Sequence, residues 1–267
     1  MQVQTRKNTN EPVRFDKITE RLQGLVRDGG WSGIIDSAVI TQKIAHRVHN
    51  GIKTREIDDL SAQICASMML EKPEYGGLAG RIAIDNHQKN TSPSFLCVVK
   101  TLRANRDING QPAPLVSEEL EGLAEKHSRW IQDTLDFDRD FDLGYFGFKT
   151  LQKGYMLSMN GEPVERPQHL FMRVAFGIHS DDLERVEETY THWSERCNTH
   201  ATPTLFHSGT ARPQMSSCFL LGTDDSVEGI YKTITDCARI SKWAGGIGVH
   251  ISNIRSKGAY IRKTGGR

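Results

Sequence analysis

One stretch near the carboxyl end constrains the fold most, because its pattern changes from strand to helix and back to strand. Residues 216–221 form an apolar run, and after a short turn Ile230, Ile234 and Ala238 recur at helical spacing. Residues 248–252 have the pattern of another short strand. Consecutive strand, helix and strand form the crossover unit of a parallel sheet. The pattern therefore predicts an α/β region here.

Residues that suit helix caps bound the predicted helix on both sides. Asp225, with Glu228 three residues later, forms a capping-box-like start. Gly245 and Gly246 suit a left-handed helix end, because glycine adopts a positive φ without a steric penalty.

The composition is that of ordinary soluble protein. A chain of 267 residues, 25% charged and 37% hydrophobic, suggests one to two domains. The formal net charge of +1 gives no global electrostatic case for binding nucleic acid or a membrane. The polar amino terminus lacks the apolar core of a secretory signal, and no apolar run approaches the roughly 20 residues of a membrane span. We therefore expect neither nucleic acid nor a membrane among the partners.

The cysteine pattern argues against a disulfide framework and against structural zinc. The five cysteines are odd in number and widely spaced, and none belongs to a C-x-x-C or zinc-finger spacing. They are Cys65, Cys97, Cys197, Cys218 and Cys237. This usage predicts a reducing, cytoplasmic compartment and no metal bound by this chain.

Residues 1–92 have the pattern of a compact, mostly helical unit. Val3 and residues 13–15 are expected to pair as a hairpin around the polar turn at residues 6–10. Four helices are predicted: Asp16 can cap the first, the second follows Asp36, the third follows Thr54, and the fourth carries Leu78 and ends near Asn90. From the residues alone, a helical bundle with a solvated basic turn explains this segment.

Residues 93–212 predict a second helical region. Ser117 can cap one of its helices, and residues 165–168 resemble the start of another. Residues 137–155 are rich in aromatic side chains, but their acidic neighbours make stacking on nucleic-acid bases a poor explanation. We expect these aromatic side chains to pack against a neighbouring domain.

Several long strings of the chain together resemble one known family. They are ATPTLFHSGTARPQMSSCFLL, DDSVEGIY, ISKWAGGIGV and IRSKGAYI and, upstream, FDRDFDLGYFGFKTLQKGY and GEPVERPQHLFMRVAFGIH. The chain resembles, over essentially its whole length, the large subunit of class I ribonucleoside-diphosphate reductase. This resemblance implies a mainly α fold followed by α/β. It divides the chain into an ATP-cone (1–92), a helical domain (93–212) and the first strands of a ten-stranded α/β barrel (213–267), incomplete in this chain.

The resemblance places an ATP or dATP effector in the cone. The matching positions are Arg6, Glu11, Pro12, Val13, Arg14, Phe15, Asp16, Lys17, Thr54, Asp58 and Lys89. Among them, Arg6, Lys17 and Lys89 supply positive charge for phosphates. The family usually has a Lys-Arg-Asp-Gly turn in the hairpin, and this chain has Thr5-Arg6-Lys7-Asn8. One expected lysine is therefore missing, and Lys7 is the candidate replacement.

Cys218 has two readings. By itself it is most simply a small hydrophobe in an apolar strand. The resemblance instead identifies it as one of two redox cysteines that reduce the substrate and close to a disulfide, with the partner on a later barrel strand that this sequence lacks. Thr202 and Ser217 match positions that contact the substrate nucleotide, although the loop from residue 203 to residue 213 is equally explained as a plain connection.

A second effector site is implied where two large subunits bind a deoxynucleoside triphosphate between them. The matching positions are Asp225, Ser226, Val227, Lys242, Arg255, Arg262 and Lys263. Asp225 and Ser226 are equally well explained as helix caps. Arg255 and Lys242 are chemically reasonable partners for a triphosphate.

The resemblance also implies partners, because the sequence does not contain the barrel's radical-bearing part. These are a complementing carboxy-terminal part, a small metal-containing, radical-generating subunit, a second large subunit and a reductant of the thioredoxin or glutaredoxin type. A split gene, an exon before an intervening element and an incomplete record all explain the missing part. Two functions remain open. One is an enzyme component that, with its complement, makes deoxyribonucleoside diphosphates for DNA synthesis. The other is a regulatory nucleotide-binding module or non-catalytic remnant.

Overall fold

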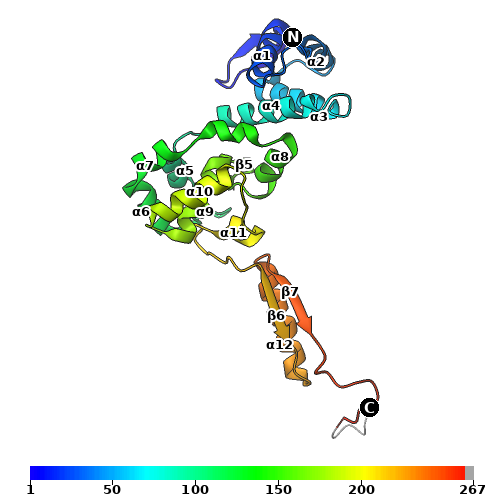
Figure 1. Ribbon diagram of the computed structural model, residues 1–267, viewed down its shortest axis with the longest axis vertical. Helices are drawn as coiled ribbons and strands as arrows, with labels where there is room; N and C mark the ends of the chain where they lie inside the picture. The colour runs from blue at the N-terminus through cyan, green and yellow to red at the C-terminus, as the bar shows by residue number, and fades with distance from the viewer. Residues whose placement is uncertain (262–267) are drawn as a thin grey trace.

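The computed structural model describes residues 1–261, which form three bodies along one long axis (Figure 1). We call residues 1–90 the amino-terminal lobe, residues 91–212 the helical lobe and residues 213–261 the βαβ body. In Figure 1 they lie at the top, in the middle and below. The first two are mainly helical and the third is α/β, in the order that the sequence predicts.

The amino-terminal lobe combines four helices with a small sheet. Its elements are β1 (Gln2–Gln4), β2 (Asn10–Pro12), α1 (Phe15–Asp28), α2 (Ser37–Ala45), β3 (Ile52–Lys53), α3 (Thr54–Ser67) and α4 (Glu74–Asn90). Strand β1 runs antiparallel to β2 and parallel to β3, so that Val3 lies opposite both Glu11 and Ile52. The predicted hairpin is confirmed, but its second strand comes earlier than expected, because Phe15 already begins α1.

The predicted cap of α2 is confirmed, and the predicted cap of α1 is wrong. Asp36 caps α2 and accepts a hydrogen bond from the Ala38 amide at 2.8 Å, as predicted. Asp16 does not cap α1, because the cap position belongs to Arg14, whose guanidinium donates to the Asp16 carboxylate in the first turn. In the hairpin turn Asn8 has a φ of 58°, which asparagine tolerates better than most residues. Asn8 thus occupies the turn position where the resembling family has glycine.

The helical lobe packs against α4 through its aromatic stretch. Its elements are α5 (Phe95–Arg103), α6 (Glu118–Lys126), α7 (Ser128–Thr134), η1 (Phe137–Asp142), α8 (Tyr145–Gly154), β4 (Ser158–Met159), β5 (Glu162–Pro163), α9 (Pro167–His179), α10 (Leu183–Ser194) and α11 (Thr202–His207). Phe148 is fully buried, and the guanidinium of Arg81 on α4 lies 4.9 Å from the centre of the Phe141 ring. Phe146 is the exception in this packing, because it is 84% exposed.

Gly80 of α4 lies directly against the backbone of the helical lobe. A methyl group there would lie 3.0 Å from the Tyr145 amide nitrogen and 3.1 Å from the Leu143 carbonyl oxygen. Both contacts are with backbone atoms, which cannot move aside as a flexible side chain can. The absence of a side chain at Gly80 therefore lets α4 serve as a wall of both lobes.

An ion pair is buried at the centre of the helical lobe. Arg173 of α9 donates to the Glu165 carboxylate at 2.6 Å, and both side chains are only 1% exposed. The Glu165 carboxylate also accepts from the Leu157 amide at 2.8 Å, and Arg173 donates to the Ser208 carbonyl at 2.7 Å. These contacts join the β4–β5 hairpin, α9 and the end of α11 around one pair of charges.

A second buried polar network holds η1 against its neighbours. The carboxylate of Asp140 accepts from the side-chain amides of Gln88 at 2.9 Å and Gln168 at 3.1 Å. Gln168 in turn accepts from the hydroxyls of Tyr190 at 2.8 Å and Ser194 at 2.7 Å. The network therefore ties α4, η1, α9 and α10 together.

The βαβ body confirms the predicted crossover. Its elements are β6 (Cys218–Gly222), α12 (Val227–Lys242) and β7 (Gly246–His250), and the two strands run parallel, with Cys218 opposite Gly246. The cap of α12 is Ser226, which accepts from the Gly229 amide at 2.9 Å, rather than Asp225. The left-handed residue after α12 is Ala244, with a φ of 59°, rather than Gly245. Gly245 has a packing role instead, because a methyl group there would clash with Ile240 and Phe219.

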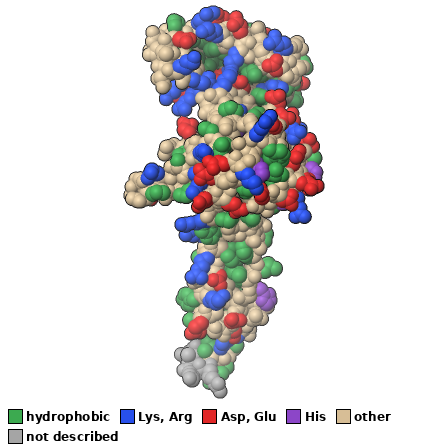
Figure 2. Space-filling view, turned by 90° about the vertical axis from the view of Figure 1, so that its left-hand side faces the viewer, with side chains coloured by type: hydrophobic (Ala, Val, Ile, Leu, Met, Phe, Trp, Pro, Cys, Tyr) green, Lys and Arg blue, Asp and Glu red, His purple; other side chains and the backbone are tan. Residues whose placement is uncertain are grey.

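The βαβ body exposes more apolar surface than a finished α/β core does. Leu220 of β6 is 91% exposed, and on α12 Val227 and Ile234 are 67% and 57% exposed. Hydrophobic side chains are accordingly visible over this lower part of the molecule in Figure 2. Within residues 1–261 no helix is long and apolar enough to cross a membrane.

The buried ion pair gives a first prediction. We expect Arg173→Met to reduce the free energy of unfolding by about 3–5 kcal/mol, because the Glu165 carboxylate would stay buried without its partner. The control is Arg129→Met, which removes an Arg–Asp pair whose side chains are 96% and 74% exposed. Such a pair contributes about 0–1 kcal/mol. Urea unfolding followed by helical circular dichroism measures both, and equal losses would contradict the central role of Arg173.

Three buried groups, two in the helical lobe and His87 on α4 beside it, make the stability of the protein depend on pH. Burial lowers the pKa of His87 to about 4 and that of His169 to about 3. Burial also raises the pKa of Asp140 to about 6. As the pH falls from 7 to 5, each histidine takes up a proton more readily in the unfolded chain, which favours unfolding. Asp140 takes up its proton more readily in the folded chain, which partly offsets that loss.

We expect a net loss of roughly 2 kcal/mol of unfolding free energy between pH 7 and pH 5, since two histidines oppose one carboxylate. His169→Gln should remove most of its own share, about 2 kcal/mol, and so flatten the pH profile. His46→Gln is the control, because His46 is exposed. Urea unfolding at both pH values measures these differences, and an unchanged profile in His169→Gln would refute the assignment.

Candidate functional site

A basic cavity opens on the amino-terminal lobe between the β1–β2 turn, the start of α1, the start of α3 and the end of α4. Its volume is about 470 Å³. It is lined by Thr5, Arg6, Lys7, Thr9, Glu11, Lys17, Ile18, Arg21, Thr54, Ile57, Asp58 and Lys89. We call it the basic cavity, because five cations and two acids line it. Lys and Arg side chains are also numerous on the face of this lobe shown in Figure 2.

The structure divides the cone residues expected from the sequence into two groups. Six of them line the basic cavity, namely Arg6, Glu11, Lys17, Thr54, Asp58 and Lys89. The run from Pro12 to Asp16 does not belong to its lining. Within that run the side chains of Arg14 and Asp16 pair with each other on the surface, where they are 55% and 54% exposed.

Arg21 lines the cavity although the sequence analysis did not select it. A usable signal was present, because Arg21 follows Lys17 by four residues and so lies on the same face of α1. Lys7 also lines the cavity, at the turn where the expected lysine is missing. The positive charge of the cavity therefore comes partly from residues that one-to-one matching with the family does not identify.

The carboxylate of Asp58 lies at the floor of the basic cavity between two arginines. Arg6 donates to it at 2.7 Å, and Arg21 donates to its other oxygen. Burial raises the pKa of Asp58, and the two guanidinium groups act in the opposite direction. Asp58 therefore holds both arginines at the mouth of a site that an anion can enter.

Asp85 binds two of the cations that line the basic cavity, although it does not line the cavity itself. Its carboxylate accepts from Lys89 at 2.6 Å and also from Arg21. Burial alone would raise the pKa of Asp85, but the hydrogen bonds from Lys89 and Arg21 outweigh it and lower the pKa. Asp85 thus stays ionised and keeps both cations in place.

The proposed substrate-contacting residues lie where the helical lobe meets the βαβ body. Thr202 begins α11 and shares a hydrogen bond of 3.2 Å with the Tyr155 hydroxyl. Thr204 donates to the Met215 carbonyl at 3.2 Å, which brings α11 beside the segment that leads to Ser217 and Cys218. Cys218 is exposed at the first position of β6 and forms no disulfide. Leu220 of the same strand is also exposed, so the exposure of Cys218 does not by itself distinguish a packing residue from a redox residue.

The second group of expected effector residues is gathered only in part. Arg255 donates to the Asp225 carboxylate at 2.7 Å, beside the α12 start at Ser226 and Val227. Lys242 ends α12, which has 16 residues, and so lies roughly 22 Å along the helix axis from that start. Arg262 and Lys263 lie outside the described residues. One chain therefore does not bring Lys242 to Asp225 and Arg255.

The described residues offer no obvious metal centre. Within residues 1–261 no group of three His, Cys, Asp or Glu side chains is placed to hold a metal ion. All five cysteines are free. Cys65 is buried, and that burial raises the pKa of its thiol to about 12, so it is unreactive at neutral pH.

Comparison with known proteins finds the same family along the chain. Residues 141–213 match "Ribonucleotide reductase, all-alpha domain", and residues 216–267 match "Ribonucleotide reductase, barrel domain". The chain is 47% identical over 267 residues to the ribonucleoside-diphosphate reductase large subunit of Plasmodium falciparum (isolate Dd2), covering 100% of this chain and 33% of that protein.

Two further relatives are large subunits of the same reductase. The large chain 2 of this reductase from Saccharomyces cerevisiae is 48% identical over 268 residues, covering 100% of this chain and 31% of that protein. The large subunit from Arabidopsis thaliana is 46% identical over 268 residues, covering 100% of this chain and 33% of that protein. The chain thus spans about a third of the length of the curated relatives it matches.

The charge of the basic cavity gives a prediction with ATP as the probe. Lys17→Ala should weaken ATP binding by roughly 1–3 kcal/mol, the contribution of a charge-assisted hydrogen bond. The control is Lys43→Ala, because Lys43 is an exposed lysine on α2 away from the cavity. Isothermal titration calorimetry of the whole chain measures both variants. Equal affinities for the two variants would mean that ATP does not use this cavity.

Proposed function

We propose that this chain, which belongs to the ribonucleotide reductase large-subunit family, forms the amino-terminal part of a ribonucleoside-diphosphate reductase large subunit. The observation that carries the proposal is sequence identity of 46–48% to such subunits over the whole chain. Chains this similar share a fold, and the matched regions include both an all-alpha and a barrel domain. The described helices and the βαβ body agree with that division.

The amino-terminal lobe is proposed to be an ATP-cone that binds ATP or dATP as effectors. The basic cavity supports this role, because Arg6, Lys17 and Lys89 line it and can meet the charge of a triphosphate. Arg21 and Lys7 add two further cations. Thr54 and Asp58 supply oxygen atoms that can accept from a ribose or base. In this proposal Pro12 to Asp16 form the connection from β2 into α1 outside the cavity.

A specificity effector, a deoxynucleoside triphosphate, is proposed to bind at the start of α12. Arg255 is the cation for its phosphates, and the α12 amino terminus adds backbone donors. Because Lys242 lies at the opposite end of α12, it would join the site from a second large subunit. The exposed apolar side chains of α12 support such pairing, since they need a partner surface.

The βαβ body is proposed to be the start of a ten-stranded α/β barrel in which Cys218 acts as a redox cysteine. Two thiols, Cys218 and one from the complementing part, give up two electrons and two protons and close to a disulfide. The ribose C2′–OH becomes C2′–H, and its oxygen leaves as water. A reductant of the thioredoxin or glutaredoxin type reopens the disulfide, and a small metal-containing subunit supplies the radical.

A purely regulatory nucleotide-binding module is the competing function. Such a module has no use for a redox cysteine or for a barrel segment. The match of residues 216–267 to the reductase barrel domain therefore favours the enzyme component.

The enzyme role is tested by complementation. The chain, mixed with the remaining carboxy-terminal part of a matching large subunit, a small subunit and a dithiol reductant, should reduce ribonucleoside diphosphates. Cys218→Ser should then lower turnover at least about 100-fold while ATP binding stays unchanged, because a hydroxyl cannot form the disulfide. Cys97→Ser is the control, since Cys97 is also exposed. Normal turnover in Cys218→Ser would end the redox assignment.

A further inference from the structure

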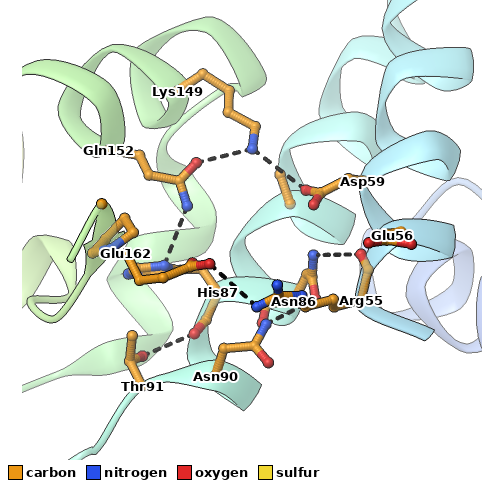
Figure 3. A pocket seen from close by; sticks show the side chains of 13 residues that line it. Arg55, Glu56, Asp59, Asn86, His87, Asn90, Thr91, Lys149, Gln152 and Glu162 are labelled. Carbon is orange, nitrogen blue, oxygen red and sulfur yellow. Dashed lines mark hydrogen bonds and ion pairs between the residues drawn. The ribbon is translucent and has the colours of Figure 1, made fainter. Parts of the chain in front are cut away.

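A second cavity lies at the joint between the amino-terminal lobe and the helical lobe (Figure 3). Its volume is about 550 Å³, and its walls are α3, α4, α8 and the β4–β5 hairpin. We call it the joint cavity. Two ion pairs cross it: Arg55 of α3 faces Glu162 of β5 at 3.3 Å, and Lys149 of α8 faces Asp59 of α3 at 3.5 Å. Its lining holds two cations and three acids and so has no excess of positive charge, which makes it an ion-paired joint rather than a site for an anion.

The joint cavity and the basic cavity are connected by hydrogen bonds of one arginine. Arg6, which lines the basic cavity, donates to the side-chain oxygens of Asn86 at 2.5 Å and Asn90 at 3.2 Å. Asn86 and Asn90 line the joint cavity. Asn86 is 5% exposed, and its amide donates to the Arg55 carbonyl at 3.1 Å. An unbroken chain of contacts therefore runs from Arg6 through Asn86 to Arg55 and Glu162.

We propose that binding of a polyphosphate in the basic cavity is coupled through Arg6 and Asn86 to the Arg55–Glu162 pair that closes the joint between the lobes. The inference rests on the proposed function, because it takes ATP as the ligand of the basic cavity. It goes further by naming the contact through which occupancy reaches the helical lobe. The proposal has two states of the contact between the lobes. Without ligand the Arg55–Glu162 pair is formed, as in this structure, and with ligand the pair is weakened.

The physical cause is competition for the donors of Arg6. Without a ligand, Arg6 is shared between the Asp58 carboxylate and two neutral amide oxygens. A phosphate is charged, and hydrogen bonds to charged acceptors are roughly twice as strong as those to neutral ones. The phosphate therefore displaces Asn86 and Asn90 from Arg6 before it displaces Asp58. The side-chain oxygen of Asn86 then keeps only the bond from the Asn90 amide, so the Asn86 side chain, and with it the bond that it donates to the Arg55 carbonyl in the first turn of α3, is held less firmly.

The same coupling must act in reverse, because linkage between two sites is reciprocal. If ATP loosens the Arg55–Glu162 pair, that pair opposes ATP binding. Glu162→Gln removes the pair at a residue that does not line the basic cavity. Since Arg55 and Glu162 are 43% and 70% exposed, the pair is weak, and we expect Glu162→Gln to tighten ATP binding about two- to fivefold. Glu187→Gln is the control, because Glu187 is an exposed acid on α10.

The test uses the whole chain and two measurements. Hydrogen–deuterium exchange should show faster exchange of the β4–β5 hairpin when ATP is added. Calorimetry should show that Glu162→Gln binds ATP more tightly than the unaltered chain. Glu187→Gln should bind ATP with unchanged affinity. In Asn86→Ala the hairpin should no longer respond to ATP although ATP still binds. Glu162→Gln keeps the proposal testable even if Asn86→Ala does not fold, because Glu162 is on the surface.

The outcomes separate this inference from the proposed function. ATP binding with an unchanged hairpin and an unchanged affinity in Glu162→Gln would overturn the coupling and leave the effector role intact. Absence of ATP binding to the unaltered chain would overturn the effector role and the coupling together. An equal gain of affinity in Glu162→Gln and Glu187→Gln would show a general effect of surface charge and would also overturn the coupling.

Discussion

The buried pair of Glu165 and Arg173 is the interaction on which the helical lobe depends. Removing two charges from water is unfavourable, and their mutual attraction compensates only when further hydrogen bonds satisfy the remaining atoms. Here the Leu157 amide and the Ser208 carbonyl do so. The pair therefore fixes the β4–β5 hairpin, α9 and the end of α11 relative to each other. Through α11 it also fixes the position of Thr202, the proposed substrate contact.

Helix α4 connects the buried ion pair of the helical lobe to the amino-terminal lobe, because its last turn contacts both. Four successive residues at its end face different surroundings. Asn86 binds Arg6, and His87 donates to the backbone oxygen of Glu165 at 2.8 Å. Gln88 binds Asp140 in the buried network, and Lys89 binds Asp85 beside the basic cavity. A single turn of α4 thus contacts both cavities and the backbone of the buried ion pair. Asn86, which contacts Arg6 of the basic cavity, is therefore the sequence neighbour of His87, which contacts the backbone of Glu165 in the helical lobe.

The sequence predicted the elements whose causes are local. Asp36 and Ser117 cap their helices because the bond runs only two or three residues along the chain. The parallel pairing of β6 and β7 followed from the strand–helix–strand pattern. Asp16 was assigned wrongly as a cap, because the side chain of Arg14 provides a competing partner that a capping rule does not consider.

Features made by distant residues could not be read in the same way. The contact of Arg6 with Asn86 joins positions 80 residues apart, and Glu165 with Arg173 gave no charge pattern that distinguishes a buried pair from a solvated one. The resemblance to the reductase family identified most of the basic lining of the cavity, but it did not identify Arg21. The separation of Lys242 from Asp225 already followed from the helix predicted between Asp225 and Gly245, but matching residues to the family one by one did not take it into account.

Photolabelling with 8-azido-ATP would test the central claim most directly, namely that the amino-terminal lobe is a nucleotide-binding unit whose site is the basic cavity. The account predicts that irradiation labels peptides from residues 5–21, 54–58 or 86–89 and that excess ATP prevents this labelling. These segments come from the three parts of the chain that line or border the cavity. Saturable labelling confined to the helical lobe or the βαβ body would contradict the account, as would labelling that excess ATP does not suppress.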